Sequence, residues 1–313
     1  MIAELTQRLL EGDRRALTRV LTFVENGYTE GRELMRELYR HSGQAQIVGV
    51  TGPTGSGKST LAGAVAREYR RRGKTVGIVA VDPTSPFSHG ALLGDRVRMQ
   101  DLTADPGVFI RSMATRGALG GLAAATDDVV SVLDASGKDV VLVETVGAGQ
   151  DEVEIADTAH TTIVVNIPGA GDDMQAIKAG ILEIADILVV NKADLPSADS
   201  VFKALHIFLS LDKNEGWQVP ILKTVANRSQ GIEELLDAIE QHRDYLVRSG
   251  RMEEMKRHRA KRQILAAAQT ILMGRLLSHN EEAGQLIAMV EAVAERRLDP
   301  RTAAEELIRT AGL

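Results

Sequence analysis

The chain has 313 residues, 44% of them hydrophobic and 3% aromatic, with a formal net charge of −6 and no cysteine. This composition argues against a nucleic-acid-binding surface and excludes disulfides, thiolate zinc sites and thiol catalysis. The charged N-terminus has no signal-peptide core, and no run approaches the roughly 18 apolar residues of a membrane span. We therefore expect a cytoplasmic protein that binds neither membrane nor nucleic acid.

Residues 1–43 are predicted to be helical. Apolar residues from Leu5 to Val24 recur at helical spacing until "ENG" interrupts the pattern, and a second helix is expected at about 31–41. We assign 1–43 to an N-terminal helical segment.

After residue 43, short β-branched runs alternate with longer helical ones. Continuously apolar strands indicate burial on both faces, hence a mostly parallel sheet covered by helices. The predicted fold class is a doubly wound α/β domain, over residues 44–245, with ligands at the carboxyl ends of its strands. The predicted strand runs are 46–52, 75–82, 107–112, 139–145, 161–168, 186–194 and 219–226.

From about residue 231 the strand signal stops. A helix is predicted at 231–247, a longer one at 248–280, and two shorter ones to the end, so that 246–313 forms a C-terminal helical arm. The stretch 243–262 holds eight Arg or Lys residues against three Asp or Glu. We interpret it as a solvated or salt-bridged helical face. A partner-docking or oligomer-forming arm and a nucleic-acid contact are the alternatives.

The stretch "GPTGSGKS" at 52–59 fits the phosphate-binding loop G-x-x-x-x-G-K-[ST]. It follows a predicted strand and opens a predicted helix, which a ligand-free glycine turn would not require. Backbone N–H groups and the helix N-terminus would hold phosphate oxygens, with Lys58 on the β- and γ-phosphates and Ser59 on Mg²⁺. The predicted phosphate-binding residues are Gly52, Pro53, Thr54, Gly55, Ser56, Gly57, Lys58, Ser59 and Thr60.

The sequence "NKAD" at 191–194 ends a late strand about 130 residues after the phosphate loop. The carboxylate of Asp194 can accept hydrogen bonds from N1–H and N2–H of guanine, a donor pair that adenine lacks. Asn191 and Lys192 would brace the loop and the base. In "TVAN", at the end of the next strand, a backbone N–H of Val225, Ala226 or Asn227 would contact guanine O6. The predicted cofactors are therefore GTP or GDP with Mg²⁺.

Carboxylates between these two motifs are candidates for the metal site. Asp82 and Glu144 end predicted strands, and Asp95 lies in "LLGDRVRM"; Mg²⁺ prefers such hard oxygen ligands. Gly147 could present its N–H to the γ-phosphate, and Gln150 could orient the attacking water. The predicted catalytic residues are Lys58, Asp95, Glu144 and Gln150.

The segment "NIPGAGDDMQAIKAG" at 166–180 carries Asp172, Gln175 and Lys178. Its composition alone favours an ordinary surface loop.

Together, "VTGPTGSGKST", "VDPTSP", "LLGDRVRM", "GALGGLA", "VETVGAGQ", "PGAGDDMQAIKAGILEIAD" and "NKAD" resemble the MeaB/ArgK/methylmalonic-aciduria-type-A group of GTPases, over nearly the whole chain. The resemblance implies a P-loop fold of the SIMIBI class. It also implies a GTPase that gates adenosylcobalamin loading and protects or reactivates a cobalamin-dependent acyl-CoA mutase, methylmalonyl-CoA mutase or a close relative. No direct cobalamin binding is expected, and homodimerisation through the C-terminal helices is implied.

Carried over residue by residue, the resemblance keeps the roles of Lys58, Ser59 and Asp194. Asp82, Asp95 and Glu144 match metal and switch carboxylates. The segment of Asp172, Gln175 and Lys178 matches an extra switch loop that signals to the mutase. The stretches "SPFSHGALLGD" and "IRSMATRGALGG" depart from the group's pattern where a partner would be sensed.

Three other functions stay open from the residues. A kinase would transfer phosphate to an acceptor, although "NKAD" favours GTP and most kinases use ATP. A nickel-type metallochaperone would need cysteine or clustered histidine. A targeting GTPase would need a methionine-rich groove or a basic RNA-binding face. For the GTPase we expect slow turnover without a partner, because no arginine finger is evident in the chain.

Overall fold

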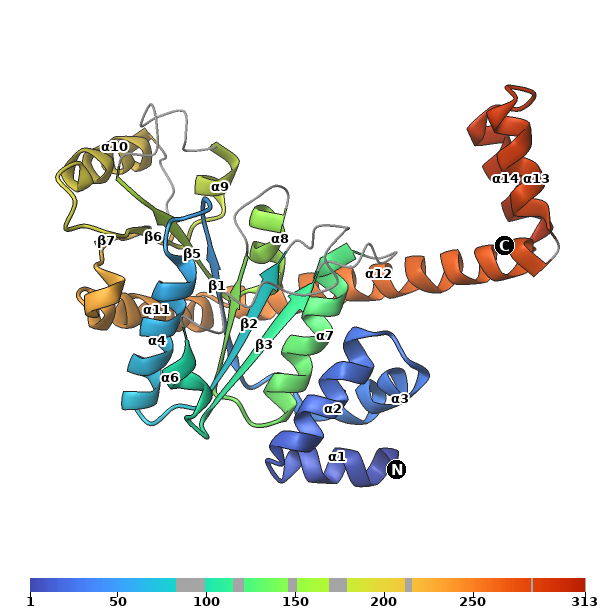
Figure 1. Ribbon diagram of the computed structural model, residues 1–313. Helices are drawn as coiled ribbons and strands as arrows, with labels where there is room; N and C mark the ends of the chain where they lie inside the picture. The colour runs from blue at the N-terminus through green and yellow to red at the C-terminus, as the bar shows by residue number, and fades with distance from the viewer. Residues whose placement is uncertain are drawn as a thin grey trace.

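The structure, a computed structural model, describes residues 1–82, 99–114, 121–145, 151–168, 179–211, 216–282 and 284–312. Within these ranges seven strands form one parallel sheet in the order β3-β2-β4-β1-β5-β6-β7 (Figure 1). The parallel, doubly wound α/β prediction is confirmed. The strands are β1 (Gln46–Thr51), β2 (Val76–Asp82), β3 (Val108–Ala114), β4 (Val140–Glu144), β5 (Thr161–Asn166), β6 (Ile187–Val190) and β7 (Ile221–Lys223).

Strand β1 lies at the centre of the sheet, between β4 and β5. Every residue of β1, β4, β5 and β6 is buried, which is why these runs are apolar without alternation. The register pairs Val50 of β1 with Glu144 of β4, and Glu144 in turn with Ala80 of β2. The carboxyl ends of β2, β4 and β1 therefore lie next to one another at one edge of the sheet.

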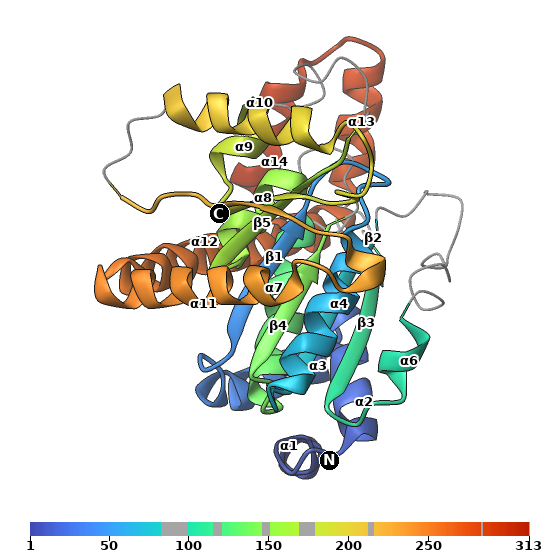
Figure 2. The same ribbon diagram turned by 90° about the vertical axis from the view of Figure 1, so that its left-hand side faces the viewer.

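One face of the sheet is covered by α4 (Lys58–Arg71) and α11 (Ile232–Arg248), with the short helices α6 (Gln100–Thr103) and η2 (Ala226–Arg228) beside them (Figure 2). Leu61 and Val65 of α4 and Ile239 of α11 are fully buried against Val48 and Val50 of β1. Because α4 starts at the phosphate loop, this packing holds the start of the helix against the central strand.

The opposite face is covered by α7 (Gly121–Ala135), α8 (Asp151–Thr158) and the N-terminal helices. These are α1 (Ile2–Leu10), α2 (Arg14–Glu25), α3 (Thr29–Leu38) and the single turn η1 (Tyr39–His41). The prediction of a single helix before "ENG" is wrong, because the chain turns between α1 and α2. Asp13 caps α2 there, its Oδ1 accepting hydrogen bonds from the N–H groups of Arg15 at 2.7 Å and Ala16 at 3.1 Å.

Two further helices cover the side of the sheet that carries β5 and β6. They are α9 (Ala179–Glu183) and α10 (Ala198–Leu211), which share a core with Val164, Leu188 and Val190.

The C-terminal part is entirely helical where it is described, as predicted. Helix α12 (Arg251–Glu282) packs first against α11 and α7 and then extends beyond the α/β domain to carry α13 (Gln285–Ala294) and α14 (Pro300–Thr310) (Figure 1). In the described part of the chain, none of the helices combines the length and apolarity needed to cross a membrane.

Candidate nucleotide-binding site

The phosphate loop connects β1 to α4 and has positive φ at Gly52, Gly55 and Gly57, and at two of these, Gly52 and Gly57, there is also no room for a Cβ. Gly52 has φ +137°, and a Cβ there would lie 2.3 Å from the carbonyl oxygen of Val165. Gly57 precedes α4 with φ +87°, and a Cβ there would lie 2.5 Å from Nδ2 of Asn191. The loop therefore packs closely on β5 and on the "NKAD" segment, and a side chain at either glycine would separate them.

Lys58 is the first residue of α4 and is 5% exposed. Its Nζ donates hydrogen bonds to the carbonyl oxygens of Gly52 at 2.8 Å and Pro53 at 3.1 Å. The ammonium group thus lies over the phosphate loop at the positive end of a 14-residue helix. A helix N-terminus with a lysine beside it is a strong anion site.

Ser59 and Glu144, two predicted metal ligands, are in direct contact. Ser59 Oγ donates a hydrogen bond of 2.6 Å to Glu144 Oε1, and both residues are 6% exposed. A hydroxyl and a carboxylate in contact provide the hard oxygen donors that Mg²⁺ prefers, so the residues present fit this ion. The backbone of Asp82 ends the neighbouring strand β2, and its side chain lies outside the described part of the structure.

Asn191 links three segments of the site. Its Nδ2 donates to the carbonyl oxygen of Ser56 at 2.9 Å, and its Oδ1 accepts from Thr224 Oγ1 at 3.1 Å and Ala226 N at 3.3 Å. Lys192, with φ +55°, donates from Nζ to the carbonyl oxygen of Gly55 at 2.9 Å. These bonds hold the "NKAD" and "TVAN" segments against the phosphate loop.

Asp194 differs from Asn191 in being accessible. Its side chain is 39% exposed and lies 3.8 Å from Nη2 of Arg228. In "TVAN", the N–H of Val225 donates to the carbonyl oxygen of Gln230 at 3.1 Å and the N–H of Ala226 donates to Asn191 Oδ1 at 3.3 Å, so Asn227 is the better candidate for a contact to guanine O6.

The family described as "Methylmalonyl Co-A mutase-associated GTPase MeaB" matches residues 17–282. The chain belongs to the MeaB family. It is 49% identical over 313 residues to a relative from Pyrococcus abyssi, covering 99% of this chain and 96% of the relative.

Two other relatives of this MeaB-family GTPase bear more specific names. The GTPase ArgK of Escherichia coli is 33% identical over 315 residues, covering 98% of this chain and 95% of ArgK. The mouse "Methylmalonic aciduria type A homolog, mitochondrial" is 30% identical over 323 residues, covering 96% of this chain and 77% of that protein.

A solved structure described as "LAO/AO transport system kinase" matches with a TM-score of 0.73 and 28% identity. The match covers all of this chain and 98% of that one. The structural match therefore extends over the arm as well as the sheet.

Several predicted residues of this MeaB-family site lie outside the described residues. They are Asp95, Gly147, Gln150, Asp172, Gln175 and Lys178. Pro53 and Thr54 lie in the phosphate loop and Thr60 in the first turn of α4.

Sequence reasoning missed a pair of threonines at the base of the site. Thr145 Oγ1 donates to Thr51 Oγ1 at 2.9 Å, and both residues are buried. Thr51 precedes the phosphate loop, and Thr145 follows Glu144. The available signal was a threonine at the end of each run: Thr51 is the last residue of β1, and Thr145 directly follows β4.

Proposed function

We propose that this MeaB-family protein binds GTP with Mg²⁺ and hydrolyses it slowly, as a timing device for a partner enzyme. The observation that carries the proposal is the contact between Ser59 and Glu144, next to Lys58 and to the "NKAD" segment, which Asn191 links to the same loop. In P-loop GTPases catalysis comes almost entirely from positioning and electrostatics, and in this proposal the residues that make these contacts provide both.

In this proposal each residue has a defined task. Lys58 and the backbone N–H groups from Gly52 to Thr60 bind and orient the phosphates. Ser59 and Glu144, with Asp82 and Asp95, hold Mg²⁺, which when bound neutralises charge on the β- and γ-phosphate oxygens. Gly147 and Gln150 contact the γ-phosphate and the attacking water.

Substitution of Lys58 tests the phosphate site. Lys58→Ala removes the buried ammonium and should weaken GTP binding by about 100-fold or more, since a charge-assisted contact to phosphate is lost. Isothermal titration with GTP measures this. Lys203→Ala, at an exposed position of α10, is the matched control and should bind GTP as the wild type does. Unchanged affinity in Lys58→Ala would overturn the assignment.

We further propose that the partner is an adenosylcobalamin-dependent acyl-CoA mutase, whose cofactor loading this GTPase gates and which it protects or reactivates. Support comes from the family's description as mutase-associated and from the mouse relative named for methylmalonic aciduria. The test is co-purification with each cobalamin-dependent mutase of the host, together with GTPase assays. Neither binding nor acceleration with any of them would refute this role.

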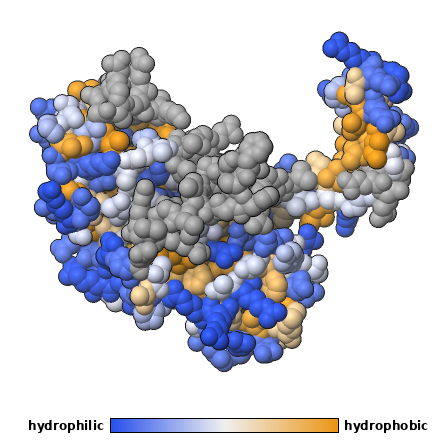
Figure 3. All heavy atoms as spheres, in the orientation of Figure 1, coloured by the Kyte–Doolittle hydropathy of each residue, from blue (hydrophilic) through white to orange (hydrophobic). Residues whose placement is uncertain are grey.

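A homodimer formed through the C-terminal arm, residues 246–313, completes the proposal. Large apolar side chains gather on the arm (Figure 3). Among the described residues of the arm, the exposed ones are Val247, Ile264, Leu265, Ile271, Leu272, Ile287, Val290 and Ile308. Such a surface is typical of a protein interface.

A kinase is the second candidate, because the matching solved structure is described as one. Transfer of labelled γ-phosphate from a nucleotide to an acceptor other than water would support it. Release of free phosphate alone would support the GTPase.

A further inference from the structure

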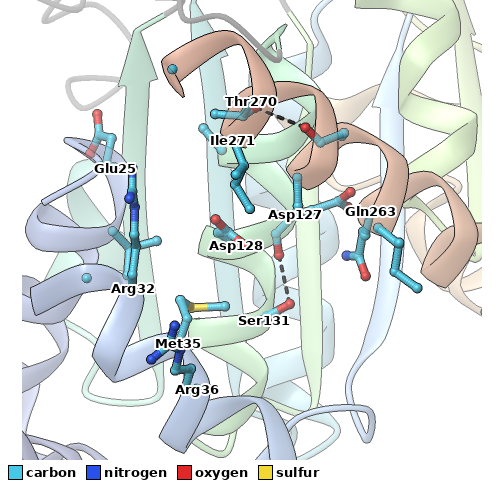
Figure 4. A pocket seen from close by; sticks show the side chains of 18 of the residues that line it. Glu25, Arg32, Met35, Arg36, Asp127, Asp128, Ser131, Gln263, Thr270 and Ile271 are labelled. Carbon is cyan, nitrogen blue, oxygen red and sulfur yellow. Dashed lines mark hydrogen bonds between the residues drawn. The ribbon is translucent and has the colours of Figure 1, made fainter. Parts of the chain in front are cut away.

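The carboxylate of Asp127, on α7, is 1% exposed and is contacted from two other helices. Arg259 Nη2 of α12 lies 3.1 Å from its Oδ1, Arg262 Nη2 of α12 donates to its Oδ2, and Thr158 Oγ1 of α8 donates to its Oδ1 at 3.1 Å. We call these four residues the Asp127 junction. Figure 4 shows α7 and α12 side by side at this place.

Arg262 contacts α7 and α8 at the same time. Besides its bond to Asp127, its Nη2 donates to the carbonyl oxygen of Asp157 at 3.3 Å and to Thr158 Oγ1 at 3.4 Å. The position of this one guanidinium group therefore depends on how α8 lies relative to α7.

The junction is not fully satisfied. The Nε atoms of Arg259 and Arg262 are both buried and have no hydrogen-bond partner among the residues that the structure describes. Two guanidinium groups also share this one carboxylate. A network of this kind is sensitive to small displacements, because a buried polar group gains or loses a full hydrogen bond when its neighbour moves.

Both α7 and α8 continue from the edge of the sheet that carries the nucleotide site. Strand β4 ends at Glu144 and α8 begins at Asp151; β3 ends at Ala114 and α7 begins at Gly121. Helix α8 has eight residues, so Thr158 is only about 10 Å from its first residue and moves with it. A shift at the start of α8 therefore reaches Arg262.

The junction also lies next to the exposed part of the arm. Arg259 and Arg262 lie on α12 immediately before its exposed apolar residues Ile264 and Leu265. The groove between α3, α7 and α12 begins at the same place, with Asp127, Asp128 and Arg262 in its wall.

We propose that the Asp127 junction couples the nucleotide state of the site to the position of α12. The proposal rests on the proposed GTPase function. When α8 shifts, Arg262 loses its bonds to α8 but keeps its ion pair with Asp127, so α12 follows α7 alone. If the bound nucleotide changes the affinity for a partner that binds the arm, thermodynamic linkage requires that the partner change the affinity for the nucleotide by the same factor.

Hydrogen exchange of α12, measured on the full chain with GDP and with a non-hydrolysable GTP analogue, tests this coupling. We expect amides between residues 263 and 278 to differ by at least about fivefold between the two states in the wild type. Arg262→Met keeps the aliphatic stem but removes the donors, and should reduce the difference to less than about twofold. Arg257→Met, at an exposed position of the same helix, is the matched control and should keep the full difference.

A second variant covers the case in which Arg262→Met does not fold. Thr158→Val removes only the hydroxyl from α8, keeps the side-chain shape, and should also reduce the difference. An equal exchange pattern in both nucleotide states of the wild type, or a full difference in the folded variants, would overturn the proposal. GTP binding and hydrolysis, measured on the same samples, distinguish a failure of the junction proposal from a failure of the proposed GTPase function. A wild type that hydrolyses GTP without any exchange difference refutes the junction alone.

Discussion

At the scale of the residue, Asn191 and Asp194 of "NKAD" differ in their surroundings. Asn191 is 2% exposed, and its side-chain amide makes three hydrogen bonds within the protein, with Ser56, Thr224 and Ala226. Asp194 is accessible and keeps its carboxylate within reach of a ligand. Asn191 therefore supports the shape of the site, whereas Asp194 is the residue that we propose selects the base.

Asp194→Asn should exchange base preference. The amide can donate to the C2 carbonyl of xanthine but repels N2–H of guanine, so GTP affinity should fall by at least about 100-fold while XTP binding rises. Competition binding with GTP, XTP and ATP measures this. A variant that keeps its preference for GTP would contradict the assignment of Asp194.

His160 provides a test of stability against pH. Its Nδ1 accepts a hydrogen bond of 3.2 Å from the N–H of Ile47, and burial, with the positive charges of Arg259 and Lys256, lowers its pKa to about 4. A lowered pKa means that the unfolded chain binds the proton more readily. The stabilising effect is therefore present above about pH 6.5 and is lost as the pH falls toward 4.

His160→Asn can keep an acceptor for Ile47 but cannot titrate. Between pH 6.5 and 4.5 the wild type should lose about 1–2 kcal/mol more unfolding free energy than the variant. Urea unfolding at both pH values measures the difference. Asp186, whose pKa burial raises to about 7, is present in both proteins and cancels. Parallel pH profiles would rule out this role for His160.

At the scale of the element, one carboxylate attaches the N-terminal helices to the sheet. Asp134 of α7 is 7% exposed and accepts hydrogen bonds from three consecutive N–H groups, those of Gly43 at 2.5 Å, Gln44 at 3.1 Å and Ala45 at 3.0 Å. These residues lead directly into β1. The start of the central strand is therefore positioned by α7 as well as by its own pairing.

Asp134→Ala would leave these three N–H groups without their acceptor and should lower the free energy of unfolding by about 3 kcal/mol. Chemical denaturation measures the loss, and limited proteolysis should show earlier cleavage near residue 43. Asp244→Ala, at an exposed position of α11, should change stability little. Equal stability of the two variants would show that the contact contributes nothing.

At the scale of the whole molecule, the arm extends away from a closed α/β domain and exposes apolar side chains that a monomer would leave in water. A charge placed in a dimer interface made by these side chains would be buried without a partner. Ile271→Glu should therefore weaken dimerisation by at least about 100-fold. Ile207→Glu, at an equally exposed position of α10, should not.

Analytical ultracentrifugation over a range of protein concentrations measures both variants. A wild type that stays monomeric at micromolar concentration, or equal dimerisation by both variants, would argue against the proposed interface.

The sequence by itself determined the parts of this protein that are encoded locally. Continuous apolar runs predicted the buried parallel strands, and the order of glycines before Lys58 and Ser59 predicted a phosphate loop. Both work because strand burial and loop conformation depend on residues that are adjacent in the chain. The break between α1 and α2 was missed, because the apolar spacing continues through a turn that only Gly12 and Asp13 mark.

Only the tertiary structure decided which distant residues meet. Ser59 reaches Glu144 across 85 positions, Asn191 reaches Ser56 across 135, and Arg262 reaches Asp127 across 135. These contacts follow from the strand order and from the path of α12 over α7, which local periodicity does not encode. The physical reason is that side-chain contacts depend on which elements pack together, whereas sequence patterns report only the environment of each element on its own.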